Sequence, residues 1–378
     1  MKKKIKTIMI LLTISFILLA ILFRLQYFNT EFGDQNFINW WFDYFRQEGF
    51  KGLGHYPFDY APLYITFVAL FSYLPFKPVL IIKCFSYLFE ILLAILVYKY
   101  LSIINKKDKK EFNILLSTIV LLIPTVIYNS SWWCQCDIIY TFFVVLSLYF
   151  YNKNNINMSF IALGLAFSFK LQFIFILPVF IILFFRDKKI KWYHFLYIPL
   201  VNLVVSIPSF ICGYSLQDLL NVYVTQTSEY SDYLSLYVNN IYTLFDFNKL
   251  FGNKTVIIMS CITVMIFVGL LVYCILKKIK FNNKNILQLS LLSILICVFF
   301  LPCMHERYLF MADVISVIYV LIYRKGYIQT ILINSISLLS YIYFIYGIKT
   351  FPNMIITIMF ILVIINQFMM FNNTSLKR

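Results

Sequence analysis

Long apolar runs separated by short basic clusters are the feature that most constrains the fold of this chain. The runs reach the roughly 20 residues that a helix needs to cross a bilayer, and they recur along the whole sequence. Of the 378 residues 62% are hydrophobic, which is far more than a soluble globular domain carries. The sequence therefore predicts an all-α polytopic membrane protein, with residues 1–378 forming a single integral membrane domain.

The basic clusters predict the orientation of the chain. They hold 21 of the 32 Lys and Arg residues, so most of the net charge of +16 orients the protein rather than binding nucleic acid. Because Lys and Arg favour the inner side, we expect a cytoplasmic N-terminus in the plasma (cell) membrane. The first run is too long for a signal peptide and is expected to remain as a span. The clusters are Lys2–Lys6, Lys106–Lys110, Lys153, Arg186–Lys191, Lys277–Lys284, Arg324–Lys325 and Lys377–Arg378.

Placing every cluster inside predicts about 10–12 transmembrane helices. Residues 158–185 are too few for two full crossings, so we expect a broken or re-entrant pair of short helices that is interrupted near Lys170. Irregular backbone at that depth must face protein or a wet cavity. The remaining spans are expected near 5–28, 79–101, 113–129, 137–151, 193–212, 255–276, 286–302, 309–323, 328–347 and 353–371.

Two long extracytoplasmic loops follow from this path. The first covers residues 29–78 and the second residues 213–253. Within the first, residues 63–76 are apolar but too short to span, so we expect an interfacial or re-entrant helix. The predicted active site lies on this extracytoplasmic face.

Ionisable side chains beside or within the spans are candidates for function, because they are costly in a membrane. Asp34 follows the first span and could take a proton from a hydroxyl group, or it could cap the helix that follows. Asp137 opens a span from the outside, where it could bind a metal or a sugar hydroxyl, or simply complement the helix dipole. Lys170 is too deep to reach the cytoplasmic surface, which favours an anionic ligand over a structural partner.

Two further segments carry candidate residues. His305, Glu306 and Arg307 occupy a short outer turn, where the Arg side chain offers a planar donor fork for phosphate. The aromatic segment around Tyr60 and Tyr64 could line a site, although aromatic belts also anchor membrane proteins.

The sequence carries no motif that assigns a cofactor. The eight Cys and three His residues show no zinc-type spacing, so a structural metal is not expected. A divalent metal such as Mg²⁺ or Mn²⁺ remains an open alternative, and Asp34 and Asp137 would be its ligands.

The order of these motifs resembles a known family. An outer Asp, Tyr-x-Pro-Leu-Tyr, Gln-x-Asp-x-x-Tyr-Thr, Phe-Lys-Leu-Gln and His-Glu-Arg-Tyr are similar to the bacterial relatives of GPI mannosyltransferases, and in part to dolichyl-phosphate-glucose glucosyltransferases. Both are GT-C glycosyltransferases, which take a sugar from a polyprenyl phosphate. The chain departs from the pattern at Cys134, where the family has Gly, and at Tyr237, where it has Asn.

The resemblance implies roles for the candidate residues. Asp34 would be the catalytic base, and His305, Arg307 and Lys170 would bind the donor phosphate. The cavity would be lined by Asp137, Gln172, Glu306, Tyr60, Tyr64 and Asn240.

The sequence thus predicts an inverting glycosyltransferase that moves one sugar to an extracytoplasmic glycan, lipid or protein. The richness in Ile, Lys, Asn, Phe and Tyr is typical of a low-GC bacterium, which would use undecaprenyl phosphate as the carrier. Two alternatives remain at this point: a transporter or flippase of lipid-linked sugars, and a polymerase or ligase of lipid-linked glycans.

Overall fold

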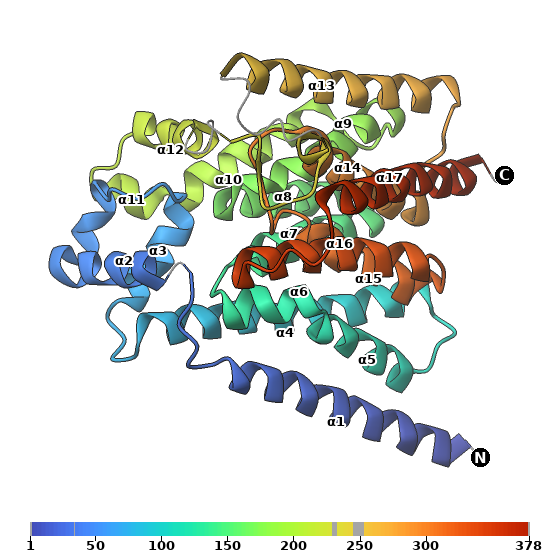
Figure 1. Ribbon diagram of the computed structural model, residues 1–378, viewed down its shortest axis with the longest axis horizontal. Helices are drawn as coiled ribbons and strands as arrows, with labels where there is room; N and C mark the ends of the chain where they lie inside the picture. The colour runs from blue at the N-terminus through green and yellow to red at the C-terminus, as the bar shows by residue number, and fades with distance from the viewer. Residues whose placement is uncertain (1, 34, 229–232, 245–252, 377–378) are drawn as a thin grey trace. The chain divides into compact units, whose positions relative to one another are not determined.

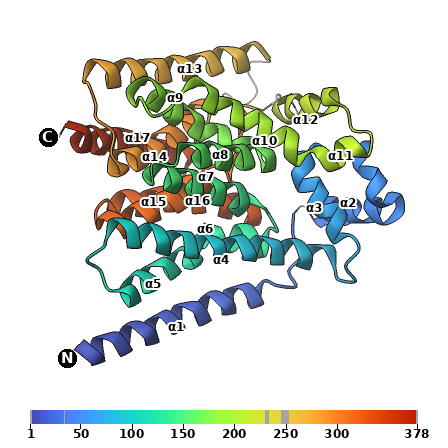
Figure 2. The same cartoon turned by 180° about the vertical axis from the view of Figure 1, so that it is seen from behind.

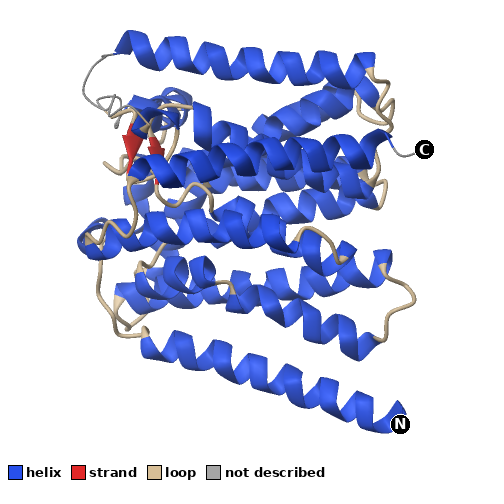
Figure 3. Ribbon diagram, turned by 45° about the vertical axis from the view of Figure 1, so that its right-hand side comes forward, coloured by secondary structure: helices blue, strands red, loops and turns tan. Residues whose placement is uncertain are grey.

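The computed structural model describes residues 2–33, 35–228, 233–244 and 253–376. Regular structure in these ranges is helical apart from two strands of two residues each (Figure 3). The chain divides into two compact units. The first comprises residues 1–173 and 193–226, and the second comprises residues 174–192 and 227–378.

Six of the described helices are long and apolar enough to cross a membrane, and a bent pair of helical segments would make a seventh. Six shorter apolar helices of 10–17 residues accompany them. The chain is therefore an all-α, multi-pass membrane protein, as predicted. The six long helices are α1 (Lys2–Gln26), α4 (Pro78–Ile104), α13 (Asn253–Leu276), α14 (Asn283–Phe300), α16 (Tyr327–Tyr346) and α17 (Asn353–Leu376) (Figure 1).

The span predicted over 113–129 is bent by 58° rather than straight. Ile123 is extended (ψ 123°), as residues before a proline usually are, and Pro124 opens the next segment. The elements on either side of the bend are α5 (Lys110–Thr118), the 3₁₀ helix η2 (Ile119–Leu122), α6 (Pro124–Ile127) and the π-helix η3 (Tyr128–Trp132).

The loop segments of the first unit are also mostly helical. The short helix expected after Pro62 is present as α3, which begins at that proline, where a missing N–H group costs nothing. The span expected over 193–212 is divided at Ser206, just before Pro208. These elements are α2 (Gln35–Glu48), η1 (Gly49–Gly54), α3 (Pro62–Phe71), η5 (Trp192–Leu196), α10 (Tyr197–Val205), α11 (Ile207–Ile211) and α12 (Leu216–Ser228).

A helical hairpin forms the centre of the first unit. The helices α7 (Asp137–Asn152) and α8 (Ile156–Phe169) are joined by a three-residue turn, and α10 lies beside α8 (Figure 2). Gly164 permits this contact, because a Cβ atom there would lie 2.7 Å from Cβ of Val201.

The predicted break near Lys170 is confirmed. Helix α8 ends at Phe169, and Lys170 is extended (φ −158°, ψ 136°). The 3₁₀ helix η4 (Leu171–Ile176) and the short helix α9 (Leu177–Arg186) follow it. The apolar run over these residues is thus divided at Lys170 into two helical pieces, Ile156–Phe169 and Leu171–Arg186.

The second unit includes four packed helices and the two strands. Helix α14 lies beside α17, and α15 (Phe310–Tyr323) lies beside α16. Amide groups join them: Nε2 of Gln329 donates to Gln367 (3.1 Å), and Nε2 of Gln367 donates to Gln288 (2.5 Å). Such hydrogen bonds between helices help association in a bilayer.

Candidate active site

The centre of the candidate site is a buried ion pair between two predicted residues of the first unit. Nζ of Lys170 lies 2.5 Å from Oδ1 of Asp137, and the two side chains are 8% and 2% exposed. Because α7 and α8 run antiparallel, the first residue of α7 lies beside the residue that follows α8. Both charges are also stabilised by helix dipoles, because the negative Asp137 lies at the N-terminus of α7 and the positive Lys170 at the C-terminus of α8. The hairpin therefore builds the pair from residues that are 33 positions apart.

Two amide side chains complete the surroundings of the pair. Nδ2 of Asn129 donates to Oδ2 of Asp137 (2.8 Å), and Lys170 also reaches Oε1 of Gln135 (3.5 Å). Two hydrogen bonds hold the backbone between Asn129 and Gln135. The N–H group of Gln135 donates to the carbonyl of Asn129 (2.8 Å), and the hydroxyl of Ser86 donates to the carbonyl of Gln135 (3.1 Å). The sequence analysis did not predict Asn129. A polar side chain within an apolar run does, however, indicate a residue that needs a buried partner.

The backbone at Cys134, where the related motif has Gly, is left-handed. Cys134 has φ 65°, in the left-handed region that glycine adopts without steric cost. The glycine of the related motif would serve this turn, which delivers Asp137 to the start of α7. Here a cysteine takes the same conformation.

An aromatic wall lies next to this segment. The ring centroids of Trp41 and Tyr60 are 4.9 Å apart, and those of Tyr60 and Tyr64 are 5.1 Å apart. Tyr64 is buried, and its side chain interacts with that of Cys136, the residue before Asp137. The structure thus brings predicted Tyr60 and Tyr64 beside the segment that carries Asp137.

Asp34 itself lies outside the described residues, but its neighbours are placed. Gly33 (φ 69°) contacts the indole of Trp133 so closely that a Cβ atom there would lie 2.8 Å from Nε1. The rings of Phe32 and Trp132 are 6.2 Å apart. The loop that leads to Asp34 therefore lies against the segment that leads to Asp137.

A buried lysine that the sequence reasoning missed holds this loop. Nζ of Lys83 in α4 donates to the carbonyl oxygens of Tyr27 (2.7 Å), Phe28 (3.1 Å) and Thr30 (2.7 Å). The Lys83 side chain is 0% exposed, and the carbonyls belong to the end of α1 and the turn after it, which have few helical partners of their own. One ammonium group thus fixes the start of the chain segment that runs to Asp34.

A second buried ion pair supports the same part of the unit. Nε of Arg24 donates to Oε2 of Glu90 (2.7 Å), and its Nη2 atom donates to the carbonyl of Leu121 (2.9 Å). This pair was also missed, although an ionisable residue in the middle of a span is the signal that identifies such sites.

The His305, Glu306 and Arg307 segment belongs to the second unit. Nη1 of Arg307 donates to Oε1 of Glu306 (3.0 Å), and Oε2 of Glu306 lies 3.7 Å from Nδ1 of His305. Glu306 is 1% exposed, so a nearly buried carboxylate orients the cationic group.

The two short strands place this segment. Strand β2 (Met304–His305) pairs in parallel with β1 (Ser235–Leu236), and the next residue, Tyr237, bridges to His305. Tyr237 has φ 62°, so the position where the family has Asn is again left-handed. Asparagine is one of the few side chains that tolerate this conformation well.

The other predicted residues have these positions. Asn240 is buried and caps the 3₁₀ helix η6 (Ile241–Thr243), since its Oδ1 atom accepts from the N–H group of Tyr242 (3.2 Å). Gln172 lies in η4, and its Oε1 atom accepts no hydrogen bond from the described residues. Both oxygens of Asp137 are engaged, and the described part of the chain contains no group of three His, Cys, Asp or Glu side chains able to hold a metal.

Comparison with known proteins identifies the family. No curated protein sequence matches the chain. The sequence model of glycosyltransferase family 87 matches residues 58–302, about two thirds of the chain, including Tyr60 and Tyr64 of the aromatic wall, the Asp137–Lys170 pair and Asn240. The match ends just before His305 and begins after Asp34. The chain therefore belongs to glycosyltransferase family 87 and is a membrane-embedded glycosyltransferase of the GT-C type.

Proposed function

We propose that this enzyme transfers a single sugar, with inversion, from a polyprenyl phosphate to an acceptor on the extracytoplasmic side of the cell membrane. Undecaprenyl phosphate is the proposed carrier, and a cell-surface glycan is the proposed acceptor. Asp34 would accept the proton of the attacking hydroxyl group, and Arg307 and His305 would stabilise the departing phosphate.

The observation that carries the proposal is the contact of Gly33 with Trp133. It holds the loop that leads to Asp34 against the segment that leads to Asp137 and Lys170. A carboxylate base beside a closed group of polar side chains suits proton transfer in a site that excludes water.

The roles of Asp137 and Lys170 are refined by their ion pair. Because Asp137 balances the charge of Lys170, the pair is neutral as a whole. We therefore propose that Lys170 contributes N–H donors to the donor phosphate rather than a full charge, and that Arg307 supplies the charge. Gln172, Glu306, Tyr60, Tyr64 and Asn240 remain proposed cavity residues.

The proposed orientation is supported by the geometry of α7. Asp137 is its first residue, and Lys153 follows its last. A helix of 16 residues spans about 24 Å, so the ion pair and the basic turn lie at opposite ends. If the basic turn is cytoplasmic, the ion pair faces outward.

Asp34→Asn is the direct test. Membranes that contain the variant, supplied with a radiolabelled undecaprenyl-phosphate sugar and with cell-surface glycan as acceptor, should lose nearly all transfer while the donor still binds. Asp43→Asn is the matched control, since Asp43 is exposed and pairs only with Arg46 among the contacts described. Full activity in Asp34→Asn would remove the base assignment. Transfer of a preassembled block instead of one sugar would favour a polymerase or ligase.

A further inference from the structure

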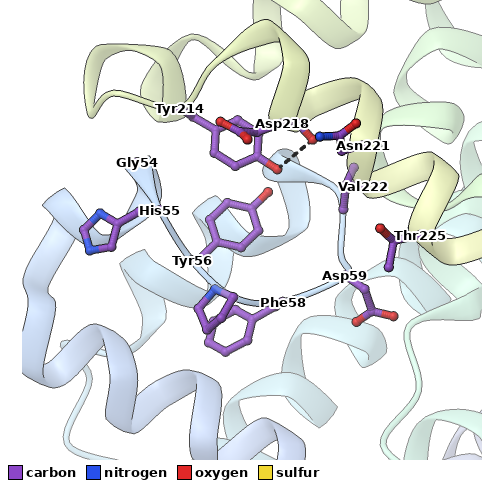
Figure 4. Close-up of a pocket in the computed structure, with 11 residues that line it drawn as sticks. Gly54, His55, Tyr56, Phe58, Asp59, Tyr214, Asp218, Asn221, Val222 and Thr225 are labelled. Carbon is purple, nitrogen blue, oxygen red and sulfur yellow. Dashed lines mark hydrogen bonds between the residues drawn. The ribbon is translucent and has the colours of Figure 1, made fainter. Parts of the chain in front are cut away.

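A cavity of about 440 Å³ lies on the first unit, apart from the Asp137–Lys170 pair. This volume falls within the range of about 300–1,000 Å³ that is typical of small-molecule sites. Figure 4 shows that its walls come from two segments, residues 54–59 on one side and Tyr214 with one face of α12 on the other. The lining residues that matter below are Tyr56, Asp59, Tyr214, Asp218, Asn221 and Thr225.

Three contacts hold the two walls together. Gly54 lies directly against the backbone of Cys212, because a Cβ atom there would collide with the Cys212 carbonyl. The rings of Tyr56 and Tyr214 stack at 5.0 Å with an interplanar angle of 6°. At the other end of the segment, the side-chain amide of Gln226 donates to the carbonyl of Asp59. Since both ends are fixed, the cavity exists before any ligand arrives, which lowers the entropic cost of binding.

The chemistry of the walls selects one class of ligand. Asp59 and Asp218 provide carboxylates, Asn221 an amide and Thr225 a hydroxyl group. The residues that line the cavity include no Lys or Arg, and their one imidazole, His55, lies 3.7 Å from the carboxylate of Glu48. A phosphate or a uronic acid would meet like charge without a cation to offset it. A neutral ligand rich in hydroxyl groups would instead find acceptors and donors against an aromatic floor.

The wall of the cavity continues toward the candidate active site. Asp59 lines the cavity, and the next residue, Tyr60, belongs to the aromatic wall through Trp41 and Tyr64. Tyr64 in turn interacts with Cys136, beside Asp137. One end of the cavity is therefore joined by direct contacts to the segment that carries Asp137.

We propose that the cavity between residues 54–59 and α12 binds the neutral, hydroxyl-rich oligosaccharide part of the acceptor, behind the sugar that receives the transferred unit. This inference rests on the proposed function for the identity of the acceptor. The binding itself does not depend on transfer, and it can be measured without a donor.

The experiment measures saccharide binding to the full-length protein in detergent by saturation-transfer difference NMR. The probes are the neutral trisaccharides mannotriose and maltotriose and the anionic trigalacturonate. At least one neutral probe should bind with a Kd on the order of 1 mM, and trigalacturonate about tenfold more weakly. Asn221→Trp fills the cavity and should weaken neutral binding about tenfold or more. Gln217→Trp places the same side chain on an exposed position of α12 outside the cavity, and should bind as the wild type does.

The outcomes separate this proposal from the proposed function. No binding of either neutral probe, unchanged binding in Asn221→Trp, or equal loss in Gln217→Trp would each overturn the cavity assignment. If Asn221→Trp does not fold, Asp59→Asn replaces it, and it should bring trigalacturonate binding closer to neutral binding. If Asp59→Asn binds trigalacturonate as weakly as the wild type does, the cavity assignment is also overturned. Normal saccharide binding together with no transfer from any polyprenyl-phosphate sugar would instead contradict the proposed function.

Discussion

The ammonium group of Lys170 lies 2.5 Å from a carboxylate oxygen of Asp137, and both side chains are buried. Removing one partner leaves an uncompensated buried charge, which typically costs about 3–5 kcal/mol. We therefore expect Lys170→Met to lower the free energy of unfolding by that amount. The double variant Lys170→Met with Asp137→Asn should recover much of the loss. Thermal unfolding in detergent, analysed as a double-mutant cycle, measures the coupling.

Additive losses in this cycle would mean that the two charges do not stabilise each other. Lys188→Met is a suitable control for loss of a lysine, because Lys188 is exposed. Its unfolding should match that of the wild type.

Lys83 should act as a positioning residue for Asp34. In Lys83→Met three carbonyls lose their donor, and the turn that leads to Asp34 loosens. Because a displacement of about 1 Å can cost about 10²-fold in rate, we expect kcat to fall by that order while the KM for the donor changes little. Lys77→Met is the control, since Lys77 is exposed and contacts only the side chain of Glu31 at 3.6 Å among the described pairs. A change in donor KM with kcat intact would argue against positioning.

Cys134 should be replaceable by glycine with a gain in stability. A left-handed conformation costs a non-glycine residue about 1–2 kcal/mol. Part of this gain is offset by the greater freedom of glycine in the unfolded chain and by loss of the weak thiol contact with the Val79 carbonyl (3.4 Å). We expect Cys134→Gly to unfold at a higher temperature than the wild type, and Cys134→Val at a lower one. The reverse order would show that the thiol contact matters more than the backbone conformation.

The stability of the cavity wall should depend on pH through Asp218. The Ser215 hydroxyl and N–H groups donate to this carboxylate and lower its pKa. The stabilisation is complete above the ordinary pKa of an aspartate and is lost as pH falls through the lowered folded pKa. Ser215→Ala should therefore be less stable than the wild type at neutral pH, and the difference should shrink in acid.

Unfolding temperatures measured between about pH 3 and pH 7 test this expectation. Ser206→Ala is the control, because its hydroxyl donates to the carbonyl of Asn202 (2.7 Å) and not to a carboxylate. A difference between wild type and Ser215→Ala that stays constant with pH would contradict the assignment.

Local signals in the sequence predicted much of this architecture. The interruption near Lys170 was predictable because residues 158–185 are too few for two full crossings. The start of α3 at Pro62 was predictable because proline fixes the backbone of a first helical turn. The bend before Pro124 was missed because hydrophobicity alone continues through it.

Partners distant in sequence could not be predicted in the same way. The contacts of Lys83 with Tyr27 and of Arg24 with Glu90 join residues 56 and 66 positions apart. A single sequence shows that such ionisable residues need partners, but it does not show which partners they find. The role of Asn129 follows the same rule, since only the folded hairpin brings it to Asp137.

The parallel pairing of β1 with β2 has a consequence for biogenesis. The 67 residues between Leu236 and Met304 include the long helices α13 and α14. Both helices must therefore be synthesised before β2 can pair with β1. Closing so large a loop is slow compared with forming a helix. The His305–Arg307 segment should consequently reach its final position only after these helices have been inserted in the membrane.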